Sequence, residues 1–249
     1  MKEDRYEEIM QMLEEHKTVR VADITERLNV TDMTIRRDLK ELEDKGLLQR
    51  VHGGAKKVED TAFAERSHSE KKEINIEEKK RIGKLAASFI AENDVIFIGP
   101  GTTNEFIIDY LDVSAAKIIT NSIDIFSKIS TDDRFEVILI GGKLRRRTGT
   151  FIGTFSTDML KKINVHKAFV GTNGIYDNHV TTANEEEGDA QRIVLDRADE
   201  RYILADTSKL GVKAFYSFFP LSEATAVITG TEAPPEVANV LKNYTGIIY

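Results

Sequence analysis

Residues 31–42 read Thr-Asp-Met-Thr-Ile-Arg-Arg-Asp-Leu-Lys-Glu-Leu, and their pattern predicts a helix with one apolar side. Ile35, Leu39 and Leu42 fall at i, i+4 and i+7 and make that apolar stripe. Thr31 can cap the helix, because its hydroxyl can accept a free backbone N–H of the first turn. The residues off the stripe include Thr34, Arg36, Arg37 and Lys40. A helix that buries one side and shows Thr and Arg elsewhere can lie in a major groove.

The residues before this helix are typical of the first part of a helix-turn-helix. Apolar residues at helical spacing predict a helix from about residue 2 to 16, and a short strand can form at 19–21. Ile24 and Leu28 mark a second helix that stops at Asn29. A tight turn after Asn29 then leads into the third helix.

The residues after the third helix predict a wing. Gly46 is placed to end the helix as a C-cap. Two strands, at 47–51 and 56–58, would flank the turn His52-Gly53-Gly54-Ala55. Arg50 and His52 lie where a wing can touch phosphate or a base. The whole pattern is that of a winged helix-turn-helix, which we assign to residues 1–58.

Composition describes a soluble globular protein of 249 residues, long enough for two ordinary domains. No apolar run approaches the roughly 20 residues of a membrane span, so no membrane partner is expected. The absence of Cys excludes disulfides and Cys-ligated metals. The N-terminus, Met-Lys-Glu-Asp, has no apolar signal core, and together these features favour the cytoplasm.

The charge distribution fits a nucleic-acid partner only locally. The net charge is −7, yet residues 31–57 hold seven Lys or Arg against five Asp or Glu. A local basic face is sufficient, because phosphate attraction is screened within roughly 10 Å.

The rest of the chain predicts a linker and an α/β domain. Residues 59–76 carry few large apolar side chains and are assigned to a partly ordered linker. From residue 77 to 249, helical stretches alternate with continuous apolar runs, which favours a mainly parallel sheet with helices on both sides. The runs are at 95–98, 117–120, 137–140, 168–170, 202–205, 226–229 and 246–249.

Polar or Gly-rich residues follow nearly every one of these predicted strands. In a parallel sheet, ligands bind beyond the carboxyl ends of the strands. Glycines let the backbone approach a ligand, and free N–H groups at a helix start attract an anion. The set therefore suits a small, hydroxylated, phosphorylated ligand, with Lys209 offering charge to the phosphate. The predicted ligand-binding residues are Gly99, Gly101, Thr102, Thr103, Asn121, Ser122, Gly141, Gly142, Gly171, Asp206 and Lys209.

The run Thr-Ile-Arg-Arg-Asp-Leu followed by Arg-Val-His-Gly-Gly-Ala resembles the N-terminal domain of DeoR-family bacterial transcription regulators, over roughly residues 3–58. That family often has Ser where this chain has Thr31. The second half resembles the family's effector domain, itself similar to ribose-5-phosphate isomerase, in its Gly-Thr-Thr turn, its Thr-Asn-Ser and its Asp206-x-x-Lys209. Where many members have Asp-Ser, this chain has Gly99-Pro100, a form that resembles the lactose phosphotransferase-system repressor subgroup, whose inducer is tagatose-6-phosphate.

The resemblance implies a repressor of sugar utilisation that a phosphorylated sugar releases from double-stranded operator DNA. We also expect a homo-oligomer, a dimer or tetramer, and no cofactor. The lack of Cys and of metal-ligand spacing predicts no metal site. Within the third helix and the wing, phosphate contacts are assigned to Arg37, Lys40 and Arg50, and base contacts to Thr31, Thr34 and Arg36; His52 can take either.

Two other functions stay open at this point. The first is a sugar-phosphate isomerase with a DNA-binding appendage, in which Glu186, Asp206 and Lys209 would supply acid–base groups. No carboxylate in the sequence is placed with certainty for proton abstraction. The second is a transcriptional activator or an architectural DNA-binding protein.

Three further features have plainer interpretations. The run at 145–147, three arginines, is typical of a solvated loop or an oligomer contact. Glu185-Glu186-Glu187 is expected to open a helix, where the dipole favours acidic groups. His68, His166 and His179 show no metal-ligand spacing.

Overall fold

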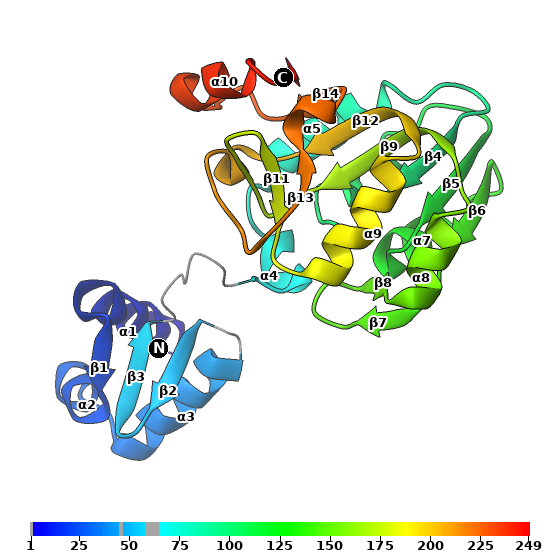
Figure 1. Cartoon of the computed structure of the whole chain (residues 1–249). Coiled ribbons are helices and arrows are strands. Elements are labelled where there is room, and N and C mark those ends of the chain that lie inside the picture. The colour runs from blue at the N-terminus through cyan, green and yellow to red at the C-terminus, as the bar shows by residue number, and fades with distance from the viewer. Residues whose placement is uncertain (1, 45–46, 58–64) are drawn as a thin grey trace. The chain divides into compact units, whose positions relative to one another are not determined.

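In the computed structural model, the described residues of the N-terminal unit, residues 1–61, form three helices and three short strands (Figure 1). The structure describes residues 2–44, 47–57 and 65–249. The strands pair antiparallel in the order β1-β3-β2. The elements are α1 (Lys2–His16), β1 (Thr18–Arg20), α2 (Val21–Leu28), α3 (Asp32–Asp44), β2 (Leu48–Val51) and β3 (Gly54–Lys57).

The predicted winged helix-turn-helix is confirmed in its helices and its wing. Ile35, Leu39 and Leu42 are buried with side chains from α1 and α2 in one core. The backbone N–H of Thr34 donates to Thr31 Oγ1 at 3.3 Å, so Thr31 caps α3 as expected. Asn29 ends α2 in the left-handed conformation (φ 51°).

Two strands of the N-terminal unit differ from the sequence prediction. The first strand lies one residue earlier than 19–21, because Val21 already begins α2. The strand expected at 56–58 starts at Gly54, where an added Cβ would overlap the carbonyl oxygen of Val19 on β1. Only glycine allows β1 and β3 to approach this closely. Gly46 and Val58 lie outside the described residues.

The larger unit, residues 62–249, is built on a sheet of seven parallel strands in the order β15-β14-β12-β9-β4-β5-β6. All six neighbour pairs in it run parallel. Its strands are β4 (Val95–Ile98), β5 (Ala116–Thr120), β6 (Phe135–Leu139), β9 (Val165–Gly171), β12 (Ala198–Leu204), β14 (Ala226–Ile228) and β15 (Gly246–Ile248). Each of the seven predicted apolar runs overlaps one of these strands, which confirms the parallel α/β prediction.

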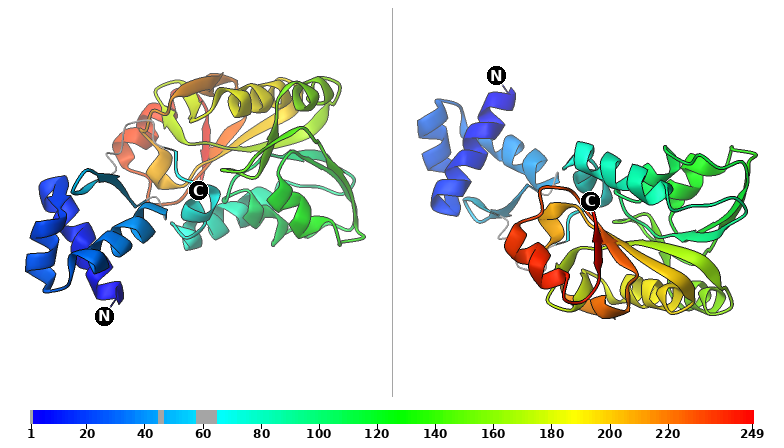
Figure 2. Two further views of the ribbon diagram at one scale, coloured as in Figure 1. Left: turned by 90° about the horizontal axis from the view of Figure 1, so that it is seen from below. Right: turned by 90° about the horizontal axis from the view of Figure 1, so that it is seen from above.

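Helices cover both faces of this sheet (Figure 2). Alternate residues of the central strands point to opposite sides, so that Phe97 packs in the core under α8 and α9 while Ile96 and Ile98 pack under α5, α6 and α7. The helices are α4 (His68–Lys72), α5 (Ile76–Ala87), α6 (Glu105–Ile108), α7 (Ile123–Ile129), α8 (Thr154–Leu160), α9 (Glu185–Leu195) and α10 (Pro235–Leu241), with 3-10 turns η1 (Thr207–Lys209) and η2 (Leu221–Glu223).

Two small antiparallel sheets were not predicted. Both are made of strands of three to five residues, too short to give a clear alternating pattern. They are β7 (Lys143–Arg145) with β8 (Thr150–Ile152), and β10 (Gly174–Tyr176) with β11 (His179–Thr182) and β13 (Tyr216–Pro220).

The range predicted as a linker contains regular structure in its described part. Ser67 caps α4 in a capping box, since Glu70 N donates to Ser67 Oγ and Ser67 N donates to the Glu70 carboxylate. Among the helices that the structure describes, none has the length and apolar character needed to cross a bilayer.

Candidate functional site

The exposed side of α3 carries the predicted DNA-reading residues. The Arg36 side chain is 55% exposed and the Arg37 side chain 80% exposed. Arg36 pairs with Asp32, and Arg37 Nε lies 3.4 Å from Glu41 Oε1. Exposed i,i+4 pairs of this kind contribute little to stability, so the guanidinium groups can exchange them for DNA phosphates or bases at small cost.

A shallow hollow lies beside these arginines, between α1 and α3. Asp38, 2% exposed, accepts hydrogen bonds from Arg5 Nε at 2.8 Å and Nη2 at 3.2 Å. This charge-assisted pair fixes α3 against α1 and so sets the orientation of the exposed face. The lining residues are Arg5, Thr31, Met33, Thr34, Arg37 and Asp38.

The wing presents the remaining predicted DNA contacts. Arg50 N donates to Glu43 Oε1 at 2.8 Å, which ties β2 to the end of α3. His52 is exposed in the turn, next to Gly53 in the left-handed conformation (φ 78°). The structure thus brings Thr31, Thr34, Arg36, Arg37, Lys40, Arg50 and His52 into one small unit, with only Thr34 partly buried.

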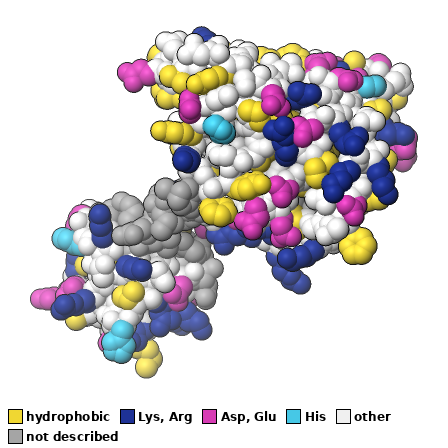
Figure 3. Space-filling model, viewed as in Figure 1, with side chains coloured by type: hydrophobic (Ala, Val, Ile, Leu, Met, Phe, Trp, Pro, Cys, Tyr) yellow, Lys and Arg dark blue, Asp and Glu magenta, His cyan; other side chains and the backbone are white. Residues whose placement is uncertain are grey.

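The face of the larger unit that Figure 3 shows has a different character. Lys and Arg are interspersed there with Asp and Glu rather than gathered in one basic area. The electrostatic pattern needed to follow a nucleic-acid backbone is therefore not found on that face.

All eleven residues predicted to bind a ligand lie at carboxyl ends of strands in the parallel sheet: Gly171 is the last residue of β9, and the other ten follow β4, β5, β6 or β12. Because those strands run parallel, their carboxyl ends lie along one edge of the sheet, called here the strand-end edge. The chain runs outward from β4 through β5 to β6, then returns to β9 on the other side of β4 and continues outward to β12, so the strand order reverses between β4 and β9. Ligands of open α/β sheets bind at such a switch point.

The loop after β4 offers free hydrogen-bond donors at this switch point. In the described residues, the backbone N–H groups of Thr102, Thr103 and Asn104 donate to no protein acceptor, although the three residues are at most 8% exposed. Asn104 Nδ2 donates to Gly99 O at 2.8 Å and to Phe169 O at 3.3 Å, which holds the ends of β4 and β9 together. Buried donors without partners favour a bound acceptor, such as an oxyanion.

Lysines gather where β12 ends. Lys209 is half-buried, and its ammonium makes no hydrogen bond or ion pair within the described part of the chain. Lys79 is 3% exposed, and burial lowers its pKa while the charges of Lys209 and Lys71 lower it further. Burial likewise lowers the pKa of Lys71. A bound anion would relieve the repulsion among these three cations.

Asp206 holds the turn that carries Lys209 against the start of α5. Its Oδ1 accepts from Asn75 Nδ2 at 3.0 Å and from Ser208 N at 3.1 Å, so it caps η1 and anchors the start of α5. Its charge opposes the lowering of the pKa of Lys79.

The arginine run at 145–147 is not simply a solvated loop, and that interpretation is wrong for Arg145. The Arg145 side chain is 19% exposed and pairs with Glu65 and, at 3.3 Å, with Glu187. Burial raises the pKa of Glu187, while hydrogen bonding from Thr148 and the charge of Arg145 oppose that rise. Arg146 and Arg147 are exposed.

The acidic triplet opens α9 as predicted, with Asn184 as the N-cap. Glu187 N donates to Asn184 Oδ1 at 3.1 Å. Glu187 is the buried member, whereas Glu186 lies 3.6 Å from Lys143.

Several predicted ligand residues also have structural contacts. Asn121 Nδ2 donates to Phe151 O at 3.0 Å, and Ser122 caps α7. A Cβ on Gly142 would lie 2.6 Å from Ile152 O, so close packing of β7 on β8 accounts for that glycine. Lys71, Lys79 and Arg145 are the residues of the strand-end edge that sequence reasoning missed.

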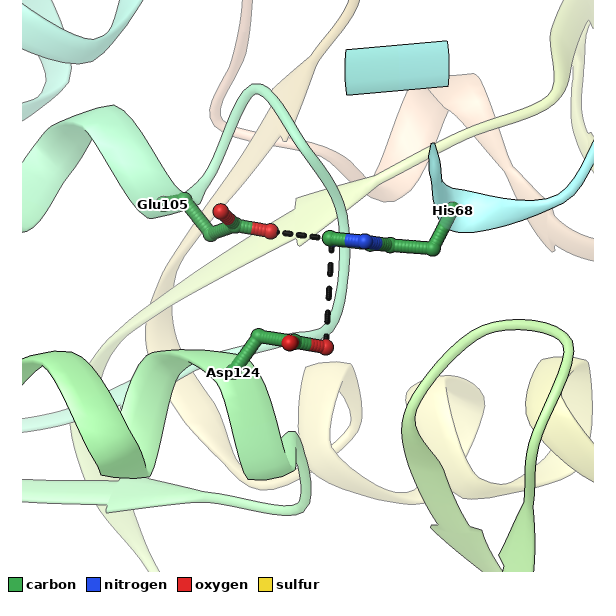
Figure 4. Close-up of side chains that lie close together, drawn as sticks. All are labelled: His68, Glu105 and Asp124. Carbon is green, nitrogen blue, oxygen red and sulfur yellow. Dashed lines mark hydrogen bonds and ion pairs between the residues drawn. The ribbon is translucent and has the colours of Figure 1, made fainter. Parts of the chain in front are cut away.

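His68 lies between two carboxylates that are distant from it in the sequence (Figure 4). Its Nε2 hydrogen-bonds Glu105 and lies 3.8 Å from Asp124 Oδ2. Their ligand atoms lie within 4.8 Å of one another, a spacing that can hold a metal ion. The hydrogen bond to Glu105 raises the pKa of His68, burial opposes this, and the charges of Glu105 and Asp124 add to the rise. Residue spacing alone does not reveal this cluster.

This cluster predicts a pH-dependent stability. The folded pKa of His68 is raised above its ordinary value of 6.5, so protonated His68 stabilises the folded state below about pH 6.5. The contribution is lost as the pH rises through the folded pKa. We expect the difference in Tm between the wild type and His68→Gln to be larger at pH 5.5 than at pH 8.5. A Tm difference that is the same at both pH values would contradict the ion pair.

Family models match both parts of the chain. The DeoR-like helix-turn-helix domain matches residues 5–61, and the DeoR C-terminal sensor domain matches residues 74–231. The chain belongs to the DeoR family. Its curated relatives include the lactose phosphotransferase system repressors of Streptococcus mutans, 41% identical over 249 residues, and of Staphylococcus aureus, 38% identical over 250 residues. Each alignment covers 99% of both chains. The subgroup suggested by Gly99-Pro100 agrees with these relatives.

Similarity to solved structures is weaker. Ribose 5-phosphate isomerase A from Methanocaldococcus jannaschii covers 53% of this DeoR-family chain and 52% of its own, with 18% identity and a TM-score of 0.38. The match to the full-length sorbitol operon regulator SorC from Klebsiella pneumoniae covers 95% of this chain and 97% of the SorC chain. The identity is 12% and the TM-score is 0.43. Scores this low carry no argument about activity.

Proposed function

We propose that this DeoR-family protein represses a sugar-utilisation operon and that a phosphorylated sugar, tagatose-6-phosphate or another phosphohexose, relieves the repression. The family membership supports a DNA-binding regulator with a sensor domain. The names of the relatives favour repression and a sugar of lactose metabolism. The observation that carries the proposal is the half-buried Lys209 ammonium, which has no partner in the described residues.

The strand-end edge fits the two chemical parts of a sugar phosphate. Lys209, Lys71 and Lys79 provide positive charge for the phosphate. The free N–H groups of Thr102 and Thr103 provide donors for phosphate or sugar oxygens. Gly101 (φ 142°) keeps the backbone open to close approach by the ligand.

The N-terminal unit fits duplex DNA. With α3 in a major groove, Arg37, Lys40 and Arg50 would contact phosphates, while Thr31, Thr34 and Arg36 would read bases. Winged helix-turn-helix units bind such sites in pairs, so a homodimer or tetramer is the assembly that we propose.

The alternative of an isomerase is disfavoured by the state of the carboxylates. A general base must be free to take a proton from the substrate. At the described strand-end edge, Asp206 is bonded to Asn75 and Ser208, Glu187 to Arg145 and Thr148, and Glu105 to His68. These three carboxylates are thus engaged in holding the fold.

A thermal-shift panel tests the proposal. The full-length protein is heated with tagatose-6-phosphate, fructose-6-phosphate, galactose-6-phosphate and their unphosphorylated sugars. A ligand at 100 times its Kd adds about 2.7 kcal/mol to the free energy of unfolding, so the true effector raises Tm by several degrees. Equal Tm values with phosphorylated and unphosphorylated sugars would refute sugar-phosphate sensing. Turnover of any sugar phosphate would favour the isomerase instead.

A further inference from the structure

Glu65 stands four residues after the end of the N-terminal unit at Thr61, and it is held tightly by the larger unit. Its side chain is 8% exposed. Its two carboxylate oxygens accept from the two terminal nitrogens of Arg145, Nη1 at 3.0 Å. Lys71 Nζ lies 3.8 Å from Glu65 Oε1. A bidentate Arg–carboxylate pair in a partly desolvated place is among the stronger side-chain contacts.

Backbone contacts fix the same segment at two more points. The Arg147 guanidinium donates to the carbonyl oxygen of Glu65. His68 N donates to Arg147 O at 2.9 Å. The turn between β7 and β8 therefore binds residues 65–68, the first described residues after the DNA-binding unit, by side chain and main chain together.

The cations that bind Glu65 also belong to the strand-end edge. Lys79 Nζ donates to the carbonyl oxygen of Lys71, and Asn75 Nδ2 donates at 3.0 Å to Asp206 Oδ1, the cap of the 3-10 turn η1 that carries Lys209. Burial lowers the pKa of Lys71, and the charges of Lys209 and Arg145 add to that lowering. A carboxylate on Arg145 and Lys71 thus occupies a position that a phosphate near Lys209 would compete for. Carboxylate and phosphate are both oxyanions that accept the paired donors of a guanidinium.

We propose that the Glu65 carboxylate is an internal anion that the phosphate of the effector displaces from Arg145 and Lys71, releasing the segment that leads to the DNA-binding unit. The inference rests on the function proposed above and names its means of regulation. Displacement leaves Arg145 paired with Glu187, so no buried charge is stranded. A phosphate, which carries more negative charge than a carboxylate, supplies the differential affinity that such a shift requires.

The charge of Glu65 is tested with Glu65→Gln, which keeps the size of the side chain. Calorimetric titrations with inorganic phosphate and with tagatose-6-phosphate compare this variant with the wild type and with Glu73→Gln. Glu73 is exposed and is the C-cap of α4, the helix that follows Glu65, so it controls for the loss of one negative charge. We expect Glu65→Gln to bind both probes at least about fivefold more tightly and operator DNA more weakly, and Glu73→Gln to match the wild type.

Unchanged or weaker phosphate binding by Glu65→Gln would overturn the displacement, even if a phosphohexose still releases the wild type from DNA. Conversely, if no phosphohexose changes DNA binding, the proposed function fails. The titrations with inorganic phosphate would still show whether phosphate competes with the Glu65 carboxylate for Arg145.

Hydrogen exchange on the wild type gives a second test that needs no variant. With saturating phosphate, we expect faster amide exchange in residues 65–70, because His68 N loses its bond to Arg147 O. Slower exchange is expected in residues 99–105, which would contact the ligand. Slower exchange in residues 65–70 would contradict displacement.

Discussion

Replacement of Lys209 by Ala should abolish the response to the sugar phosphate while leaving operator affinity intact. Lys209 is half-buried at the strand-end edge and has no partner among the described residues, so its charge is available to a ligand. Removing one partner of a buried, hydrogen-bonded charge pair costs about 2–5 kcal/mol, which is a loss of at least about thirtyfold in effector affinity. Calorimetric titration measures that loss, and fluorescence anisotropy on labelled operator measures DNA affinity.

The matched control for this substitution is Lys213→Ala. Lys213 is exposed and lies four residues after Lys209, so the Lys213→Ala substitution removes the same charge from the same region of the chain. We expect wild-type effector binding from it. If Lys209→Ala binds the effector as tightly as Lys213→Ala does, Lys209 does not contact the phosphate.

Replacement of Arg36 by Ala should weaken operator binding by about 1–3 kcal/mol and relax base preference. Arg36 is on the exposed face of α3, and among the described residues it pairs only with Asp32, one turn earlier. The substitution removes a base contact and also leaves the Asp32 carboxylate without its neutralising cation near the DNA phosphates. Anisotropy titrations on operator and on random duplex measure both effects.

A control on the other unit separates base reading from charge loss. Arg134 forms a similar exposed pair with Asp132 at 2.7 Å, far from α3 in the sequence. Arg134→Ala should leave DNA affinity unchanged. An equal loss on operator and random DNA for Arg36→Ala would make Arg36 a phosphate contact rather than a reader of bases.

The parts of the fold that the sequence predicts well are those in which local pattern and burial agree. The seven strands of the large sheet are buried on both faces, so they appear as continuous apolar runs. The stripe of Ile35, Leu39 and Leu42 was likewise predictable, because all three side chains are buried on one side of α3. Thr31 was predictable as a cap because capping depends on neighbours within three residues.

The contacts that sequence reasoning missed join residues far apart in the chain. Arg145 meets Glu65 and Glu187, which are 80 and 42 residues away, and nothing in a run of three arginines distinguishes the buried one. His68 meets Glu105, 37 residues away, for the same reason. By contrast, the Ser67-x-x-Glu70 pattern was a readable capping signal for α4 inside the predicted linker.

The burial of Lys79 could not be predicted from the sequence for a different reason. Its place on α5 is clear from helical spacing, but a lysine on a predicted helix is normally assigned to solvent. Only the packing of α5 near η1 places its ammonium beside Asp206 and Lys209. The residues of the strand-end edge were thus predictable where they follow a strand, and not where they come from helices outside the sheet.

The most direct test of the account is a titration of operator occupancy. The full-length protein is bound to a labelled duplex that it has selected from a random pool, and fluorescence anisotropy follows the addition of tagatose-6-phosphate, other phosphohexoses and unphosphorylated sugars. We predict that at least one phosphohexose releases the DNA, whereas its unphosphorylated parent at the same concentration does not. Occupancy that no sugar phosphate alters, or that the free sugar alters equally, would contradict the account.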